Sequence, residues 1–376
     1  MATEGDGRSL ALELRAAGVI GLAAALTHAA CEGVGLSGGS LAYGSLIAAL
    51  VVKPDFSRWP LAIYPVLLVL VGLCLAIGVS IGLGLSNVPQ VFVFGLVAAL
   101  MQLITLTLPS KLRLLSGVVA VAGVLPLLGT PSWESWRDEM LALSLGLAIG
   151  TLVQLVFTPA RGTSPDDKTR ASAEPPLAQR ISAGLQSPFF WRKLVFASLA
   201  LAIGEGIGAA TPKYLYFGVV LLLNDSIGAT LARVRDRMAG VSLGVLMPLL
   251  VFNCLGISDL SIGLVMAGTA ALVTALHRPN YLRTALISSG VAFVGYGPLV
   301  AWYIPHRWVD YLMGCALALS IGVLLFPQSA LRRFNRLSAE VVSDPMARAE
   351  LQALLPAASE EARWLGLPQP QLPPIG

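Results

Sequence analysis

The chain has 376 residues, of which 56% are apolar and only 12% are charged. A soluble globular domain is about 25% charged, so this chain holds too few polar residues to cover the surface of a soluble protein. The composition excludes that class and predicts an all-α polytopic membrane protein. The net charge of +4 does not indicate a nucleic-acid partner, because its meaning lies in where the charges sit along the chain.

Twelve apolar segments are predicted in chain order, six before and six after a polar linker. They cover roughly residues 12–31, 41–52, 59–85, 91–108, 112–128 and 139–157, then 191–210, 214–223, 238–255, 260–276, 281–300 and 309–326. The second and eighth segments are shorter than the roughly 20 residues that a straight span needs. We therefore expect a short, interrupted second helix in each half.

The predicted domains follow from these segments. They are a first six-span unit (residues 1–158), a cytoplasmic linker rich in Pro, Ser and charge (159–187), a second six-span unit (188–327) and a cytoplasmic C-terminal tail (328–376). Within the tail, a short helix is expected from Met346 to Leu355. Arg332, Arg333 and Arg336 lie in the same tail, where anionic lipid would attract them.

The two halves match each other at five places in one order. Glu32-Gly33-Val34-Gly35 matches Glu205-Gly206-Ile207-Gly208, and the other pairs are Tyr43-Gly44 with Phe217-Gly218, Leu112-Arg113 with Leu282-Arg283, Trp136-x-Asp138 with Trp308-x-Asp310, and Ile149-Gly150 with Ile321-Gly322. The offsets are 173, 174, 170, 172 and 172 residues. This pattern predicts two copies of one unit. Because each copy has an even number of spans, the two are expected to be parallel.

Basic residues are distributed asymmetrically between the two ends of these segments. The N-terminus, the connections after even-numbered segments and the tail hold 22 of the 25 Lys and Arg residues. The opposite connections hold only Arg137, Lys213 and Arg307. By the positive-inside rule, both termini are predicted to be cytoplasmic.

No motif of a soluble enzyme occurs in the sequence. It lacks the serine-hydrolase, zinc-protease and phosphate-loop patterns, and its four cysteines are dispersed without a C-x-x-C pair. We therefore expect no enzymatic activity, catalytic residue, metal site or cofactor.

Glu32 and Glu205 are the first candidates for a transport pathway. Ionisable residues within spans are costly and usually face such a pathway, and a desolvated carboxylate can take up and release a proton. The alternative is that both lie solvated at the membrane edge and help to end a helix. His28 lies one turn before Glu32 on the same helix face, which fits a proton relay or a simple hydrogen-bonded pair.

Two further groups are candidates for contacting an anionic or aromatic substrate. Arg233, Arg235 and Arg237 could gather anions at the cytoplasmic mouth, or could be an ordinary positive-inside anchor with Asp236 as the local counter-charge. The remaining candidates lie near the two short segments. Tyr43 and Phe217 could stack on an aromatic substrate or simply pack in the core, and Asn224 and Asp225 form a polar pair. The first half has Lys53, Pro54 and Asp55 in place of Asn224, Asp225 and Ser226, which indicates that the halves have diverged in role.

The second half resembles the fusaric acid resistance protein-like (FUSC) family, which includes aromatic acid exporters. The resemblance rests on the run from Ser226 to Gly244, SIGATLARVRDRMAGVSLG, and on the ending from Arg307-Trp308-Val-Asp310 through Gly314 to Phe326-Pro327. It extends more loosely over the first half.

The resemblance implies export of organic, often aromatic, carboxylate anions across a bacterial-type inner membrane, which we expect to be coupled to protons. Membrane lipid, a small organic anion, and a second copy of the chain or an envelope protein are the implied partners. Two alternatives remain open: a non-transporting scaffold or assembly subunit of a membrane complex, and a passive anion channel.

Overall fold

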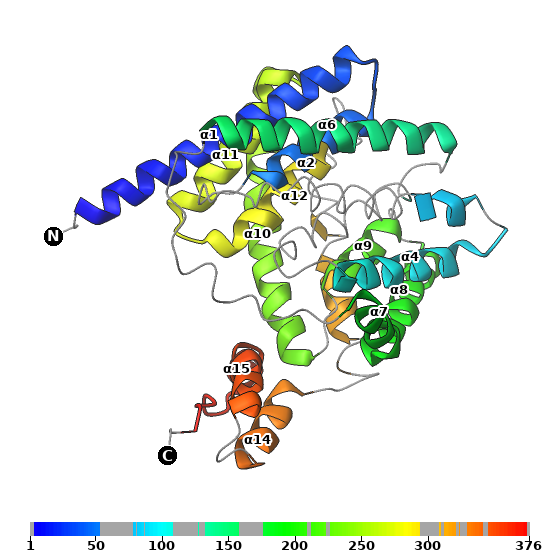
Figure 1. Ribbon diagram of the computed structural model, residues 1–376, viewed down its shortest axis with the longest axis vertical. Helices are drawn as coiled ribbons and strands as arrows, with labels where there is room; N and C mark the ends of the chain where they lie inside the picture. The colour runs from blue at the N-terminus through cyan, green and yellow to red at the C-terminus, as the bar shows by residue number, and fades with distance from the viewer. Residues whose placement is uncertain are drawn as a thin grey trace. The chain divides into compact units, whose positions relative to one another are not determined.

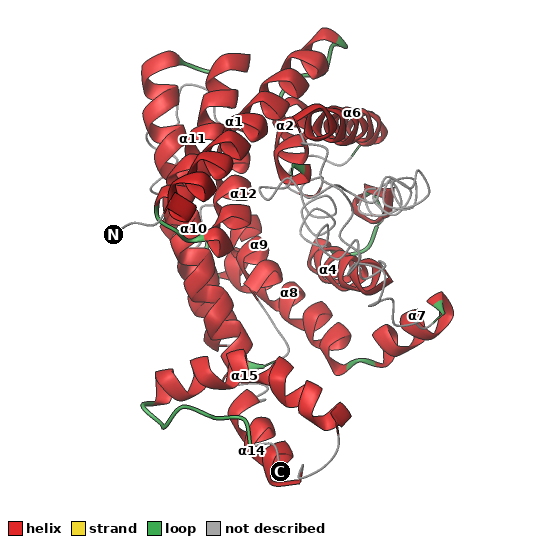
Figure 2. Cartoon of the chain, turned by 60° about the vertical axis from the view of Figure 1, so that its left-hand side comes forward, coloured by secondary structure: helices red, strands yellow, loops and turns green. Residues whose placement is uncertain are grey.

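The computed structural model describes residues 4–52, 78–79, 81–85, 87–107, 127, 132–157, 176–208, 212–222, 226–293, 308–309, 312–320, 323, 329–340 and 345–373. All regular structure within these ranges is helical (Figure 2). The principal helices are α1 (Glu4–Gly33), α2 (Gly39–Val51), α4 (Gln90–Thr107), α6 (Trp133–Phe157), α7 (Leu177–Gln186), α8 (Pro188–Gly206), α9 (Pro212–Leu222), α10 (Ile227–Leu255), α11 (Asp259–Ala275), η3 (Pro279–Tyr281), α12 (Leu282–Phe293), α14 (Ala330–Glu340) and α15 (Pro345–Leu365).

Three of these helices are long and apolar enough to cross a membrane, counted over the described ranges. They are the part of α1 from Leu14 to Gly33, all of α6 and all of α10. With the composition, they make this chain an integral membrane protein of the all-α class. The predicted segments at residues 59–85 and 112–128 fall almost entirely outside the part of the chain that the structure describes.

Helix α10 begins much earlier than the sequence predicts. The expected start was residue 238, at the end of the basic run, whereas the helix starts at Ile227. The Ser226 hydroxyl accepts a hydrogen bond from the Ala229 N–H at 3.2 Å and so caps the helix. Alanine, leucine and arginine are good helix formers, so the basic run occupies the first turns of α10 instead of a loop.

Amphipathic helices occupy two regions that the prediction left largely irregular. The linker contains α7, which packs against α4. The tail contains α14, and α15 continues to Leu365, beyond the predicted end at Leu355. The two tail helices share a small apolar core made of Ala330, Leu331, Phe334, Leu351, Ala358 and Ala362.

The chain divides into two compact units. The first comprises residues 1–194 and 239–308, and the second comprises residues 195–238 and 309–376. In the first unit, α1 packs on α11 and on α2, and α2 also packs on α6 and α12 (Figure 1). In the second unit, α14 packs on α15.

Close helix crossings in the first unit are made at glycines. A Cβ atom at Gly21 would lie 2.5 Å from the Gly263 carbonyl oxygen, where α1 crosses α11. A Cβ atom at Gly146 would lie 2.5 Å from the Gly44 carbonyl oxygen, where α6 crosses α2. These backbones approach each other in a way that a larger side chain would prevent, so the crossings fix how the helix ends meet.

Candidate functional site

The Glu-Gly-x-Gly motif ends helix α1 with a defined turn. The Val34 N–H donates to the Ala30 carbonyl at 3.2 Å, and the Gly35 N–H donates to the Glu32 carbonyl at 2.9 Å. Gly35 has a φ of 82°, a conformation that glycine adopts without steric cost. Glycine is therefore required at position 35 to end the helix. Glu32 lies in the last turn of α1, and its side chain is exposed.

The second copy of the motif makes the same turn at the end of α8. The Ile207 N–H donates to the Ile203 carbonyl at 2.9 Å, and the Gly208 N–H donates to the Glu205 carbonyl at 3.1 Å. Gly208 has a φ of 64°. Glu205 is exposed in the last turn, like its counterpart in α1. The two motifs thus share one backbone geometry, in which the glutamate side chain points away from the packed core.

His28 has an acidic partner that the sequence analysis did not identify. The imidazole is only 8% exposed, and its Nδ1 lies 2.5 Å from Oδ1 of Asp259. Asp259 is the first residue of α11, directly after the cap residue Ser258, whose hydroxyl accepts from the Ser261 N–H at 3.2 Å. A carboxylate in the first turn is also favoured by the helix dipole. The cap therefore holds Asp259 where α11 meets the end of α1.

His28, Asp259 and Glu32 form one polar cluster, called the His28 cluster below. One ligand-type atom from each side chain lies within 4.8 Å of the other two. Burial decreases from His28 through Asp259 to Glu32. Imidazole is the side chain that exchanges protons most readily near neutral pH. The cluster therefore places a buried imidazole, that of His28, close to an exposed carboxylate, that of Glu32. The partner of the His28 hydrogen bond is Asp259, whereas the sequence spacing pointed to Glu32; the relay stays a prediction.

The same three side chains are of types that bind divalent cations. Metal ligands at about 2 Å from one ion do not hydrogen-bond to each other, whereas His28 and Asp259 do. The cluster as built is therefore a hydrogen-bonded pair with an adjacent carboxylate.

The His28 cluster has no sequence counterpart in the second half. At the repeat offset of the Glu-Gly-x-Gly motif, His28 corresponds to Leu201, which is fully buried. The stretch before α4 that corresponds to the start of α11 reads Ser-Asn-Val-Pro-Gln and contains no carboxylate. The two halves thus share the backbone turn, and among the described residues the polar cluster accompanies the turn of α1, with Asp259 contributed by the second half.

The aromatic and amide candidates have different outcomes. Tyr43 is 2% exposed in α2, a helix that packs against α1, α6 and α12. Phe217 belongs to α9, but its side chain lies outside the described residues, as do Asn224 and Asp225. Their roles stay predictions.

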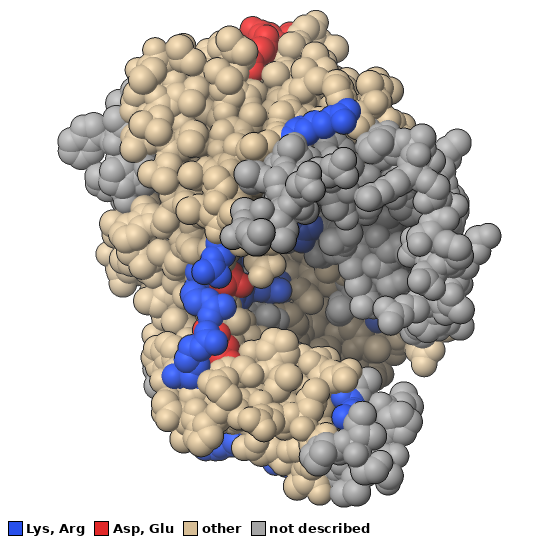
Figure 3. Space-filling view, turned by 90° about the vertical axis from the view of Figure 1, so that its left-hand side faces the viewer, with Lys and Arg blue, Asp and Glu red and all other residues tan. Residues whose placement is uncertain are grey.

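The central arginine of the basic run is bound to the C-terminal tail. Arg235 Nη1 lies 2.7 Å and 2.6 Å from the two carboxylate oxygens of Glu360 in α15. Its Nη2 lies 3.3 Å from Asp236 Oδ1, which is the counter-charge that the sequence predicts. Arg363 also contacts Glu360, at 3.1 Å. A column of basic side chains with acidic ones between them is visible in Figure 3. Arg235 therefore serves at least to fasten α15 to α10.

Gly228 explains why α10 and α15 approach closely enough for this ion pair. A Cβ atom at Gly228 would collide with the Ala357 carbonyl oxygen, so only glycine permits the observed spacing. Arg233 and Arg237 lie one turn or less away on the same helix; Arg233 is exposed and Arg237 is half-buried. The pairing of Glu360 with Arg235 could not be read from the sequence, because the two residues are 125 positions apart.

Comparison with known proteins gives one family match. Residues 199–321 match the family described as fusaric acid resistance protein-like. No curated protein and no solved structure has significant similarity to the chain. The matched stretch runs from within α8 to the last predicted span, and it includes Glu205, the basic run and Asp259. The resemblance seen in the sequence is therefore confirmed over residues 199–321, which are similar to the fusaric acid resistance protein-like family.

Proposed function

We propose that this protein is a twelve-span transporter that exports organic carboxylate anions, aromatic ones included, in exchange for protons. The observation that carries the proposal is the family match over residues 199–321. Resistance to an organic acid is what outward transport of its anion would provide. The match lies within the second half of the chain and includes Glu205 and the three arginines.

The proposed architecture is two parallel six-span units, residues 1–158 and 188–327, joined by a linker that includes α7. The identical turns after Glu32 and Glu205 support it. A second correspondence lies in the helix crossings. A Cβ atom at Gly44 would lie 3.1 Å from the Ala142 carbonyl oxygen, and one at Gly218 would lie 3.2 Å from Gly314 Cα. Both pairs join the short second segment of a unit to its sixth, at positions related by the repeat offset.

The contact between His28 and Asp259 supports the proposed number of spans. The end of segment one and the start of segment ten can meet only if an even number of crossings separates them. Segments two to nine are eight crossings, so both ends belong on one side of the membrane. Lys193 Nζ donates a hydrogen bond to Gln102 Oε1 at 3.0 Å. This bond joins the start of segment seven to the later part of segment four, and an even number of crossings, segments five and six, separates these two ends as well. With both termini in the cytoplasm, the His28 cluster would lie at the outer face.

The His28 cluster supplies the proposed proton step. Protons arriving at the exposed Glu32 carboxylate would pass to the pair of His28 and Asp259, and organic anions would be attracted at the opposite face by the arginines of α10. Glu205 would act as the second, simpler carboxylate. This assignment uses each side chain for the chemistry that its burial allows.

The direct test is efflux of a panel of radiolabelled aromatic carboxylates from cells that express or lack the protein, with and without a protonophore. Protein-dependent efflux that the protonophore abolishes is the expected result. Efflux that persists down its own gradient would replace the exchanger with a passive anion channel. No difference over the panel, with the protein present in the membrane, would replace transport with a scaffold or assembly role.

A further inference from the structure

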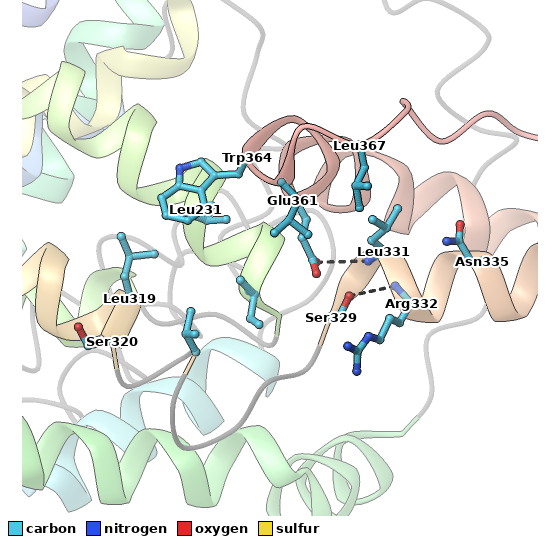
Figure 4. A pocket seen from close by; sticks show the side chains of 13 residues that line it. Leu231, Leu319, Ser320, Ser329, Leu331, Arg332, Asn335, Glu361, Trp364 and Leu367 are labelled. Carbon is cyan, nitrogen blue, oxygen red and sulfur yellow. Dashed lines mark hydrogen bonds between the residues drawn. The ribbon is translucent and has the colours of Figure 1, made fainter.

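A large apolar cavity lies within the second compact unit, residues 195–238 and 309–376. Its volume is about 750 Å³, within the range of roughly 300–1,000 Å³ that ligand sites occupy. Four parts of the chain line it: the first turns of α10, the end of the last apolar segment, the first turns of α14, and the end of α15 (Figure 4). Leu231, Leu319 and Val323 supply much of the apolar wall.

The wall between the two tail helices is held in place by a buried carboxylate. Glu361 of α15 is 5% exposed, and its Oε2 accepts hydrogen bonds from the backbone N–H groups of Ala330 at 2.8 Å and Leu331 at 3.3 Å. These are unsatisfied donors at the start of α14, so the carboxylate caps that helix. Glu361 therefore joins the end of α15 to the start of α14.

The rim of the cavity carries an exposed cation, Arg332. Its backbone N–H donates to the Ser329 hydroxyl at 3.0 Å, which orients the first turn of α14. Within the described residues, no hydrogen bond or ion pair is found for its guanidinium group, whereas that of the neighbouring Arg333 is paired with Glu350. Figure 4 shows the Arg332 side chain beside the hydroxyl of Ser329. An apolar cavity with a cation at its rim matches an amphiphile that carries one anionic group.

The position of the cavity in the chain identifies the kind of amphiphile. Leu319, Ser320 and Val323 belong to the last apolar segment, and α14 begins only a few residues later at Ala330. If the last apolar segment spans the membrane, as the proposed function requires, the cavity lies at the level where the chain leaves the bilayer. Trp364, at its edge, is 70% exposed, and tryptophan side chains favour the headgroup region of a bilayer.

We propose that this cavity binds one anionic phospholipid, with an acyl chain against Leu231, Leu319 and Val323 and the headgroup phosphate on Arg332. A bilayer supplies this ligand at the depth of the cavity. Cationic side chains at the membrane surface attract anionic headgroups, and the apolar wall of the cavity shields the acyl chain of the lipid from water. The bound lipid would join the last span to the tail hairpin of α14 and α15.

The test is native mass spectrometry of the full chain released from nanodiscs that contain phosphatidylglycerol or phosphatidylcholine. We expect the wild-type protein to retain one phosphatidylglycerol molecule after collisional activation that removes the other lipids, and to retain at least tenfold less phosphatidylcholine. Arg332→Gln should lose that preference. Arg336→Gln is the matched control, because Arg336 is an exposed arginine of the same helix that does not line the cavity.

A second variant tests the cavity itself. Val323→Trp places an indole in the cavity from an exposed position, so it should fold but retain neither lipid. Equal retention of phosphatidylglycerol by Arg332→Gln and wild type, or unchanged retention by Val323→Trp, would overturn the proposal. Loss of the lipid in Arg336→Gln to the same extent as in Arg332→Gln would also overturn it, because the attraction would then be a general effect of charge.

Discussion

The hydrogen bond between His28 and Asp259 leads to a prediction that separates stability from transport. Asp259→Ala removes the partner of a buried imidazole, and an unsatisfied buried polar group costs about 1–3 kcal/mol. The Asp259 side chain is 44% exposed, and solvent weakens interactions of exposed charges. We therefore expect a loss of about 1–2 kcal/mol, at the lower end of that range.

His28→Leu is the complementary change, because it installs the residue that the second half carries at Leu201. Replacing a buried polar group by an apolar one of similar size is often nearly neutral for stability, and the partly exposed Asp259 carboxylate can be hydrated. We expect an unfolding free energy within about 1 kcal/mol of the wild type. The variant nevertheless lacks the imidazole, so proton-coupled efflux should fall at least tenfold.

The assays are thermal unfolding in mild detergent and protonophore-sensitive efflux in cells. Asp259→Ala should melt a few degrees below the wild type, and His28→Leu should melt close to it but transport poorly. Glu134→Gln, at an exposed carboxylate in the first turn of α6, is the control for charge removal and should change neither quantity. Full coupled efflux by a folded His28→Leu protein would refute the proton role of the cluster. An unchanged melting temperature for Asp259→Ala would contradict the contact itself.

Three further predictions concern a helix crossing, the turn that ends α1, and the ion pair of Arg235 with Glu360. Gly146→Val should lower the melting temperature by the equivalent of about 1–3 kcal/mol, because its side chain would meet the backbone of α2. Gly18→Ala, with open space around its Cβ, should stabilise α1 by up to about 1 kcal/mol in the same thermal unfolding assay. The opposite order of stabilities would contradict the crossing of α6 and α2. Gly35→Ala should cost about 1 kcal/mol because its φ is 82°; a neutral effect on the melting temperature would argue against the turn. A double-mutant cycle of Arg235→Gln and Glu360→Gln should give a coupling of about 1 kcal/mol that falls with salt, since the arginine is 50% exposed; zero coupling in denaturant titrations would show that the pair does not fasten α15.

The sequence predicts the apolar helices well because the length of an apolar run is a local property. Helices α2, α4 and α11 begin and end within two residues of the predicted segments at 41–52, 91–108 and 260–276. The sequence does not predict α7 and α14, and it predicts the start of α10 too late in the chain, because these parts mix charged and apolar residues. Their helices are formed by capping and by one-sided packing, which a search for apolar runs does not detect.

The candidate site shows the same limit at a longer range. The spacing of His28 and Glu32 on one helix face could be read from the sequence, since residues four apart on a helix are neighbours. Asp259 could not, because it is 231 positions from His28 and the contact depends on how α1 crosses α11. The available signal was the polar start of α11, Ser258-Asp259, which caps a helix whether or not it has another role.

The asymmetry between the halves narrows what the two glutamates can do. Both stand in the same backbone turn, so helix termination alone explains the motif in each half. Among the residues that the structure describes, only Glu32 has a buried imidazole and a second carboxylate beside it; the second half has Leu201 at the position of His28. If the turn were the only role, Glu32→Gln and Glu205→Gln would have equal and small effects on coupled efflux. The proposed proton path instead requires Glu32→Gln to lower it several-fold more than Glu205→Gln, so the ratio of the two effects, measured in one assay at equal protein levels, decides between termination and coupling.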